Sequence, residues 1–210
     1  MEKIRLGRTG LVVTKTGFGA LPIQRVSFED AERILKKAYD GGINFFDTAR
    51  AYSDSEEKIG RALSGVRSHI IIATKTMAKD KDSMFRDLHT SLKLLKTDYI
   101  DIYQLHNPAQ LPDPNEQSGL YEGLLEAKRQ GKIRNISITQ HSLSLAKQAA
   151  HSGLYDTVQF PLSSVSSEED LALIGLCKSL DIGVIAMKAM AGGLITQAAT
   201  SFAFLRQFDN

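Results

Sequence analysis

The sequence has 210 residues, of which 42% are hydrophobic, enough to build a sizeable core in one globular domain. Its 26 basic and 24 acidic residues give a net charge of +2 and are spread along the chain, which argues against a nucleic-acid-binding surface. The single cysteine, Cys177, excludes an internal disulfide framework, and no apolar run approaches the roughly 20 residues that cross a bilayer. We therefore expect a soluble, cytoplasmic protein in which residues 1–210 form a single domain.

The pattern of apolar runs predicts a hairpin followed by buried strands. Residues 4–6 and 11–13 flank the turn-rich segment Gly7-Arg8-Thr9-Gly10, which favours a β-hairpin. Most of the later runs lack a sustained polar alternation, as expected of strands that are covered on both faces. The expected strands are residues 16–19, 44–47, 70–75, 99–106, 133–139, 157–160 and 183–188.

Helix signals separate these strands. Ser27-Phe28-Glu29-Asp30 resembles a capping box, and Ser53-Asp54-Ser55-Glu56 and Ser166-Ser167-Glu168-Glu169 are expected to open later helices in the same way. The last helix is expected at about residues 196–207. Helices between successive buried strands indicate βαβ units and a parallel sheet.

Two architectures fit seven βα units. A closed barrel has eight units and about 250 residues, whereas an open doubly wound sheet can have seven strands. The first strand is not followed by the Gly-x-Gly-x-x-Gly turn that is typical of a doubly wound dinucleotide-binding sheet, because Gly17-Phe18-Gly19 lies inside a strand-like segment. We therefore favour an α/β fold of the (β/α)8 TIM-barrel type.

Four polar residues stand at or just past the ends of expected strands: Asp47, Tyr52, Lys75 and His106. Catalytic groups of a parallel β/α barrel lie at the C-terminal ends of its strands. Each residue alone also has a purely structural interpretation. Asp47 could cap a turn, Lys75 could be a solvated strand end, and His106 could begin a loop. The four complementary groups at neighbouring strand ends favour a site for proton transfer.

The chemistry of the four groups suits protonation of a developing oxyanion. A tyrosine has a pKa of about 10, and a nearby ammonium lowers it by stabilising phenolate. Lys75 could supply that ammonium, Asp47 could hold it, and His106 could donate a hydrogen bond to a carbonyl oxygen. No side chain here can donate a hydride, so the electrons for a reduction must come from a cofactor. A nicotinamide cofactor is the simplest source.

At these residues the chain resembles the aldo-keto reductase family. Residues 41–56 (GGINFFDTARAYSDSE) are similar to that family's first signature, and Lys75 and His106 match its other two tetrad positions. The resemblance implies a (β/α)8 barrel and NADPH-dependent reduction of an aldehyde or ketone to an alcohol. It assigns Tyr52 as general acid, Lys75 as the group that lowers the pKa of Tyr52, Asp47 as its anchor, and His106 as the residue that orients the carbonyl.

The resemblance also implies a set of cofactor contacts. The expected cofactor-binding residues are Gly19, Ala20, Asp47, Thr139, Gln140, Gln159, Met187 and Lys188. Thr139 and Gln140 stand where the family usually has Ser-Asn, and Met187 stands where it often stacks an aromatic ring on the nicotinamide. The implied cofactor is NADPH, and the sequence does not exclude NADH. No histidine pair has metal-ligand spacing, so we expect no metal.

The end of the chain departs from the family pattern. Residues 186–193 (AMKAMAGG) resemble a subgroup that often carries a C-terminal ferredoxin-like cysteine cluster, which is absent here. The chain stops where the family's eighth strand would begin, so the expectation is a C-terminally incomplete barrel domain. Unpaired edges of such a barrel are a liability for self-association with another copy.

Two other functions remain open. A non-catalytic, nucleotide-binding regulatory subunit on the same scaffold is the main alternative to a carbonyl reductase. A barrel isomerase or aldolase could use Lys75 as a Schiff-base amine, although that reading leaves Tyr52 and Asp47 without matched roles. In every case the expected partner is a small molecule, with no nucleic acid and no membrane.

Overall fold

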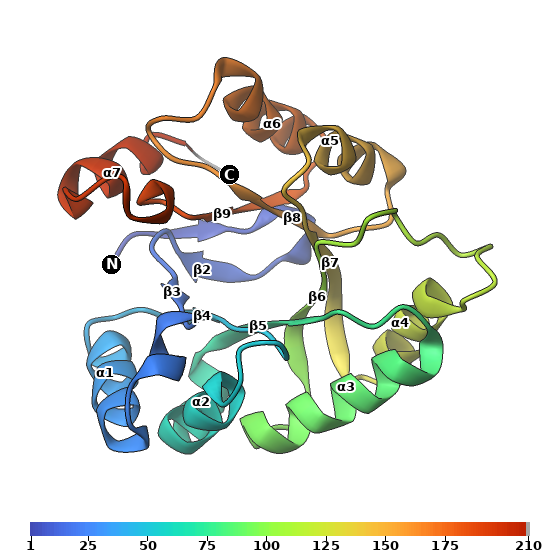
Figure 1. Cartoon of the computed structure of the whole chain (residues 1–210), viewed down its shortest axis with the longest axis horizontal. Helices are drawn as coiled ribbons and strands as arrows, with labels where there is room; N and C mark the ends of the chain where they lie inside the picture. The colour runs from blue at the N-terminus through green and yellow to red at the C-terminus, as the bar shows by residue number, and fades with distance from the viewer. Residues whose placement is uncertain (209–210) are drawn as a thin grey trace.

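The computed structural model describes residues 1–208, in which seven parallel strands form a nearly closed barrel (Figure 1). The strands are hydrogen bonded to one another in chain order. They are β3 (Phe18–Gly19), β4 (Phe45–Asp47), β5 (Ile71–Thr76), β6 (Ile100–His106), β7 (Ile133–Thr139), β8 (Thr157–Pro161) and β9 (Gly183–Met187). Parallel neighbours in sequential order require a crossover after each strand, and here each crossover carries a helix.

The helices lie around the outside of the strands (Figure 1). They are α1 (Phe28–Asp40), α2 (Ser55–Leu63), α3 (Lys81–Leu95), α4 (Leu120–Arg129), α5 (Leu143–Ser152), α6 (Glu168–Ser179) and α7 (Ala198–Leu205). The predicted barrel with seven βα units is therefore confirmed for the described residues. None of these helices is both long and apolar enough to cross a membrane.

Successive residues of each strand point to opposite faces, which divides the core into two clusters. Phe46 lies in the outer cluster, between the strands and the helices, whereas its neighbour Phe45 lies in the inner cluster with Ala73 and Ile102. This two-sided burial explains why the strands read as continuous apolar runs. Side chains that point inward near the strand ends line the top of the barrel instead.

The helix starts agree only partly with the expected caps. The α6 start is a full capping box, in which the side chains and backbone of Ser167 and Asp170 bond reciprocally. The α2 start was expected to be similar, and that expectation is wrong. Its N-terminal residue Asp54 makes no side-chain cap, and the buried Ser55 and Glu56 bond to other parts of the fold. The polar residues at this helix start therefore make tertiary contacts rather than a local cap.

An N-terminal hairpin packs against the base of the barrel. Its strands are β1 (Lys3–Arg5) and β2 (Val12–Thr14), joined through a short 3-10 turn over Gly7–Thr9. Gly7 has a φ of +49°, and a Cβ at this position would overlap the backbone of Gly183 at the start of β9. The turn therefore lies directly against the backbone at the N-terminal end of the barrel, opposite the strand ends that carry the polar residues.

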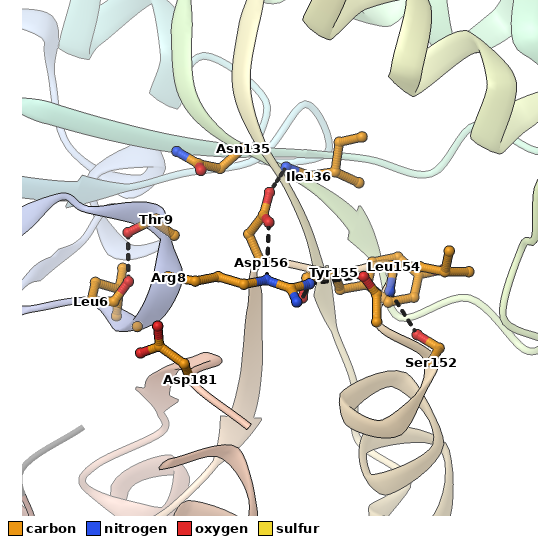
Figure 2. Close-up of polar contacts among 12 residues, drawn as sticks. Leu6, Arg8, Thr9, Asn135, Ile136, Ser152, Leu154, Tyr155, Asp156 and Asp181 are labelled. Atoms are coloured by element: carbon orange, nitrogen blue, oxygen red, sulfur yellow. Dashed lines mark hydrogen bonds and ion pairs between the residues drawn. The ribbon is translucent and has the colours of Figure 1, made fainter. Parts of the chain in front are cut away.

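Arg8 connects this turn to the segment that precedes β8 (Figure 2). Its Nε lies 3.3 Å from Asp156 Oδ1, and its Nη2 donates to the carbonyl oxygens of Tyr155 at 2.7 Å and Gly153 at 2.9 Å. The other oxygen of Asp156 accepts from the backbone N–H of Ile136 at 2.9 Å. One guanidinium thus ties the N-terminal hairpin to β7 and β8.

Replacing Arg8 by Met should lower the free energy of unfolding by about 1–3 kcal/mol, because its charge-assisted hydrogen bonds are lost and Asp156 keeps only Lys128, at 3.2 Å, as an ion-pair partner. Arg33→Met is the matched control, since Arg33 pairs with Asp30 on an exposed helix surface. That control should change stability by no more than about 0.5 kcal/mol. Urea unfolding followed by circular dichroism measures both variants, and equal effects would contradict the anchoring role of Arg8.

Candidate active site

The four polar residues singled out in the sequence lie together at the C-terminal ends of the strands. Asp47 ends β4, Lys75 is near the end of β5, and His106 ends β6. Tyr52 lies in the loop between β4 and α2, where its N–H donates to Ala49 O at 3.0 Å. The backbone of this loop also bonds to β5, through Arg50 N–H to Lys75 O at 2.9 Å. The loop therefore continues the sheet and holds the tyrosine over the barrel mouth.

A buried ion pair joins Lys75 and Asp47. The ammonium nitrogen lies 2.8 and 2.7 Å from the two carboxylate oxygens and 2.8 Å from the carbonyl oxygen of Thr48. The side chain of Lys75 is 1% exposed and that of Asp47 is 14% exposed. Burial lowers the pKa of the Lys75 ammonium, and Asp47 opposes that shift by stabilising the charge. All three N–H donors of the ammonium are engaged by these partners.

Tyr52 and His106 complete the group. The Lys75 ammonium lies 5.4 Å from the centre of the Tyr52 ring, and the Tyr52 and His106 rings meet edge-on with centres 5.8 Å apart. Burial, reinforced by the charge of Asp47, raises the pKa of Tyr52 to about 12. The lowering expected from Lys75 is not found: its N–H groups are directed at Asp47 and Thr48, and burial dominates the pKa of Tyr52. Tyr52 is therefore fully protonated at neutral pH.

His106 is a neutral imidazole at neutral pH. Burial, and secondarily the charge of Lys75, lowers its pKa to about 4. Its Nδ1 is buried without a hydrogen-bond partner among the described residues. A neutral imidazole has one N–H donor and one acceptor nitrogen, so it can orient a carbonyl oxygen but carries no spare proton to give away.

The expected cofactor-binding residues divide into two groups. Thr139 and Gln159 are buried beside Asp47: Thr139 Oγ1 lies 2.9 Å from Gln159 Oε1, and Gln159 Nε2 donates to Asp47 Oδ2 at 3.2 Å. Gln140 is also buried, but its Nε2 donates to Pro108 O at 2.7 Å, in the segment after β6. Side-chain amides and a hydroxyl at the strand ends are the donor and acceptor set that suits an amide-bearing ligand.

The remaining cofactor candidates lie on the two edge strands. Gly19 is exposed and pairs in register with Asp47, and the N–H of the buried Ala20 donates to Asp47 O at 2.8 Å. Met187 is half-buried at the end of β9, and Lys188 follows it, exposed and with a φ of +58°. These residues therefore face the mouth from opposite edges of the sheet. The described residues contain no cluster of His, Cys, Asp and Glu that could hold a metal ion.

The sequence reasoning missed two buried residues that support this site. Glu56 accepts from Thr74 Oγ1 at 2.6 Å and pairs with Arg50, so it joins the Tyr52 loop to β5. Gln104 donates to Asp47 Oδ1 at 3.0 Å. The period of two along β6 could have identified Gln104, because it lies on the same face as His106, two residues away.

Comparisons with known proteins agree with the barrel fold. The family model described as "Aldo/keto reductase family" matches residues 15–205. Aldo-keto reductase YhdN of Bacillus subtilis (strain 168) is 29% identical over 95% of this chain and 65% of its own length. L-galactose dehydrogenase of Arabidopsis thaliana is 32% identical over 94% of this chain and 68% of its own length. The chain thus spans about two thirds of these curated relatives.

Solved structures give the same result. An aldo-keto reductase from Klebsiella pneumoniae in complex with NADPH superimposes with a TM-score of 0.80 and 25% identity, over 93% of this chain and 71% of that one. The holo form of an aldo-keto reductase from Bacillus halodurans gives a TM-score of 0.82 and 27% identity, over 94% and 69%. The fold defines a β/α-barrel protein whose polar residues gather at the C-terminal ends of the strands. The chain belongs to the aldo/keto reductase family.

The lowered pKa of His106 gives a direct test of the site's electrostatics. The Cε1–H resonance of His106, assigned by its loss in His106→Asn, should titrate with a midpoint near pH 4. Since the unfolded imidazole takes up its proton near pH 6.5 and the folded one does not, the unfolding free energy should decrease as pH falls from about 6.5 towards 4. A midpoint near 6.5 would show that the imidazole is not buried as described.

Proposed function

We propose that this protein reduces an aldehyde or ketone to an alcohol with hydride from NADPH, and that Tyr52 is the general acid. The observation that carries the proposal is the buried Lys75–Asp47 ion pair, with its ammonium 5.4 Å from the Tyr52 ring, beside His106 at the strand ends. A proton donor, a fixed cation and a neutral hydrogen-bond donor around one point are what protonation of a carbonyl oxygen requires.

The residues at the mouth suit a nicotinamide cofactor. Thr139, Gln140 and Gln159 would bind its carboxamide through their hydroxyl and amide groups, and the exposed Gly19 leaves room for a close approach at the neighbouring edge. The bound cofactor would supply the hydride. NADPH is the proposed form because the relative from Klebsiella pneumoniae was crystallised with it.

The proton side of the reaction follows from the chain's own groups. Tyr52 stays protonated until negative charge develops on the substrate oxygen, and it then donates its phenolic proton. The Lys75 ammonium compensates the phenolate that is left, which requires one of its N–H groups to turn from Asp47 or Thr48 towards Tyr52. His106, as a neutral imidazole, donates a hydrogen bond that orients the carbonyl oxygen.

The aldolase alternative receives little support from the geometry. A Schiff-base lysine must present a neutral amine to the carbonyl carbon. The side chain of Lys75 is 1% exposed, and its nitrogen bonds to two carboxylate oxygens and one carbonyl oxygen. These contacts favour a fixed ammonium rather than a free nucleophile.

Tyr52→Phe should lower kcat for NADPH-dependent aldehyde reduction by about 10²- to 10⁴-fold, the usual contribution of general acid catalysis, while NADPH affinity is retained. Tyr39→Phe is the matched control, because Tyr39 lies on α1, away from the barrel mouth, and should keep full activity. NADPH oxidation with a panel of aldehydes, ketones and quinones measures the rates, and fluorescence titration measures NADPH binding. Substantial turnover by Tyr52→Phe would show that the assigned acid is wrong, whereas NADPH binding without turnover by the parent would favour a regulatory subunit.

Self-association is a second proposal, supported by the edges of the sheet. Within residues 1–208, β3 pairs only with β4 and β9 pairs only with β8. Strand edges that lack a partner can pair with another chain. Sedimentation velocity at increasing concentration should therefore reveal a dimer or larger species. A specific dimer with a micromolar Kd would be populated at about 100 μM protein. A monomer at every concentration up to that value would therefore reject the proposal.

A further inference from the structure

Gln104 is a buried amide inside the barrel for which neither the fold nor the proposed chemistry gives an obvious need. It is 0% exposed and lies on β6, where it pairs in register with Lys75 of β5 on one side and Ser137 of β7 on the other. A position inside a barrel is usually filled by an apolar side chain, since an amide loses its hydration there unless every polar atom finds a partner. Its partners therefore indicate what the amide does.

Both ends of the Gln104 amide are engaged. Its Nε2 donates to Asp47 Oδ1 at 3.0 Å, and its Oε1 lies 3.1 Å from Thr139 Oγ1. The orientation is fixed by chemistry, because an ionised carboxylate only accepts hydrogen bonds. A flipped amide would direct its oxygen at the carboxylate of Asp47 and its N–H₂ at the Thr139 hydroxyl, losing the contact that compensates the buried charge.

Gln159 makes the corresponding contacts from the other side. Its Nε2 donates to Asp47 Oδ2 at 3.2 Å, and its Oε1 lies 2.9 Å from the same Thr139 hydroxyl. Asp47, Gln104, Thr139 and Gln159 thus form a ring of polar contacts, in which the two amide oxygens share the single hydroxyl proton of Thr139. Each oxygen of Asp47 receives one N–H from the Lys75 ammonium and one from a glutamine amide. The two amides on opposite oxygens fix the plane of the carboxylate.

The plane of Asp47 decides where the Lys75 ammonium lies. The ammonium bonds to both carboxylate oxygens, at 2.8 and 2.7 Å, so a rotation of the carboxylate would move the nitrogen relative to the Tyr52 ring. Misplacement of a reacting group by about 1 Å can cost on the order of 100-fold in rate. Gln104 is the member of the ring with no other task, since Gln159 is already proposed to bind the cofactor.

We propose that Gln104 is a positioning residue, which holds the carboxylate of Asp47 in the orientation that keeps the Lys75 ammonium in place beside Tyr52. The proposal rests on the proposed reductase function, and it concerns the geometry of the proton donor rather than the binding of substrate or cofactor. A residue with this role affects the chemical step, whereas a residue that only fills space in the barrel affects stability.

Gln104→Met separates the two roles, because methionine keeps the length and volume of the side chain but removes the N–H donor. The variant should lower kcat by about 10-fold or more, with the KM for the carbonyl substrate and the NADPH affinity within about 3-fold of the parent. Ser137→Ala is the control: Ser137 is the buried register partner of Gln104 on β7, and its hydroxyl makes no hydrogen bond to the described residues. This control should keep parental kcat. A Gln104→Met enzyme with parental kcat would overturn the proposal.

A second measurement does not depend on turnover. The side-chain amide protons of Gln104, assigned through its own Cγ and Cβ in the parent protein, should be protected from exchange and should shift clearly in Asp47→Asn. The proposal would be overturned, even if the parent proved inactive, by Gln104 amide protons that exchange freely or whose chemical shifts do not change in Asp47→Asn. If the parent reduces carbonyls and Tyr52→Phe does not, the reductase function stands whatever Gln104→Met does, so the two ideas fail separately.

Discussion

The ion pair between Lys75 and Asp47 is the interaction on which the site depends. Removing two charges from water costs several kcal/mol for each ion, and their attraction compensates only when the remaining lone pairs and protons are also satisfied. Here the ammonium has three acceptors and the carboxylate has four donors. This full set of partners lets a charged pair persist inside the barrel, beside the neighbouring phenol and imidazole.

The pKa values of Tyr52 and His106 are shifted from their ordinary values in opposite directions, mainly by burial and secondarily by this ion pair. Burial disfavours the charged form of each: phenolate for Tyr52 and imidazolium for His106. The charge of Asp47 adds to the effect on Tyr52, and the charge of Lys75 adds to the effect on His106. Two neutral groups therefore face the mouth above a charged pair, so hydrogen-bond donors surround the space where a carbonyl would lie.

The sequence predicted the site residues well where a residue's position along a strand determines its surroundings. Strand ends are visible as polar residues that interrupt apolar runs, and parallel strands bring these ends together, so Asp47, Lys75 and His106 could be grouped without coordinates. Tertiary contacts were less visible. In the sequence, Glu56 resembles part of a helix cap. Its actual hydrogen bond, with Thr74, joins two different elements and leaves no local signal. Gln104 lies inside a buried strand, and no local pattern in the sequence shows that its amide contacts Asp47 and Thr139. The burial that raises the pKa of Tyr52 could not be predicted from single positions either.

The hairpin at the base has a consequence for how the chain folds. Arg8 bonds to a residue 147 positions later, and Arg5 bonds to one 176 positions later. Contacts between such distant segments carry a large loop-closure cost and form late. During synthesis the hairpin is made well before its docking site at the starts of β8 and β9. The hairpin is thus fixed only after β8 and β9 have been made, and the base of the barrel closes at that late stage.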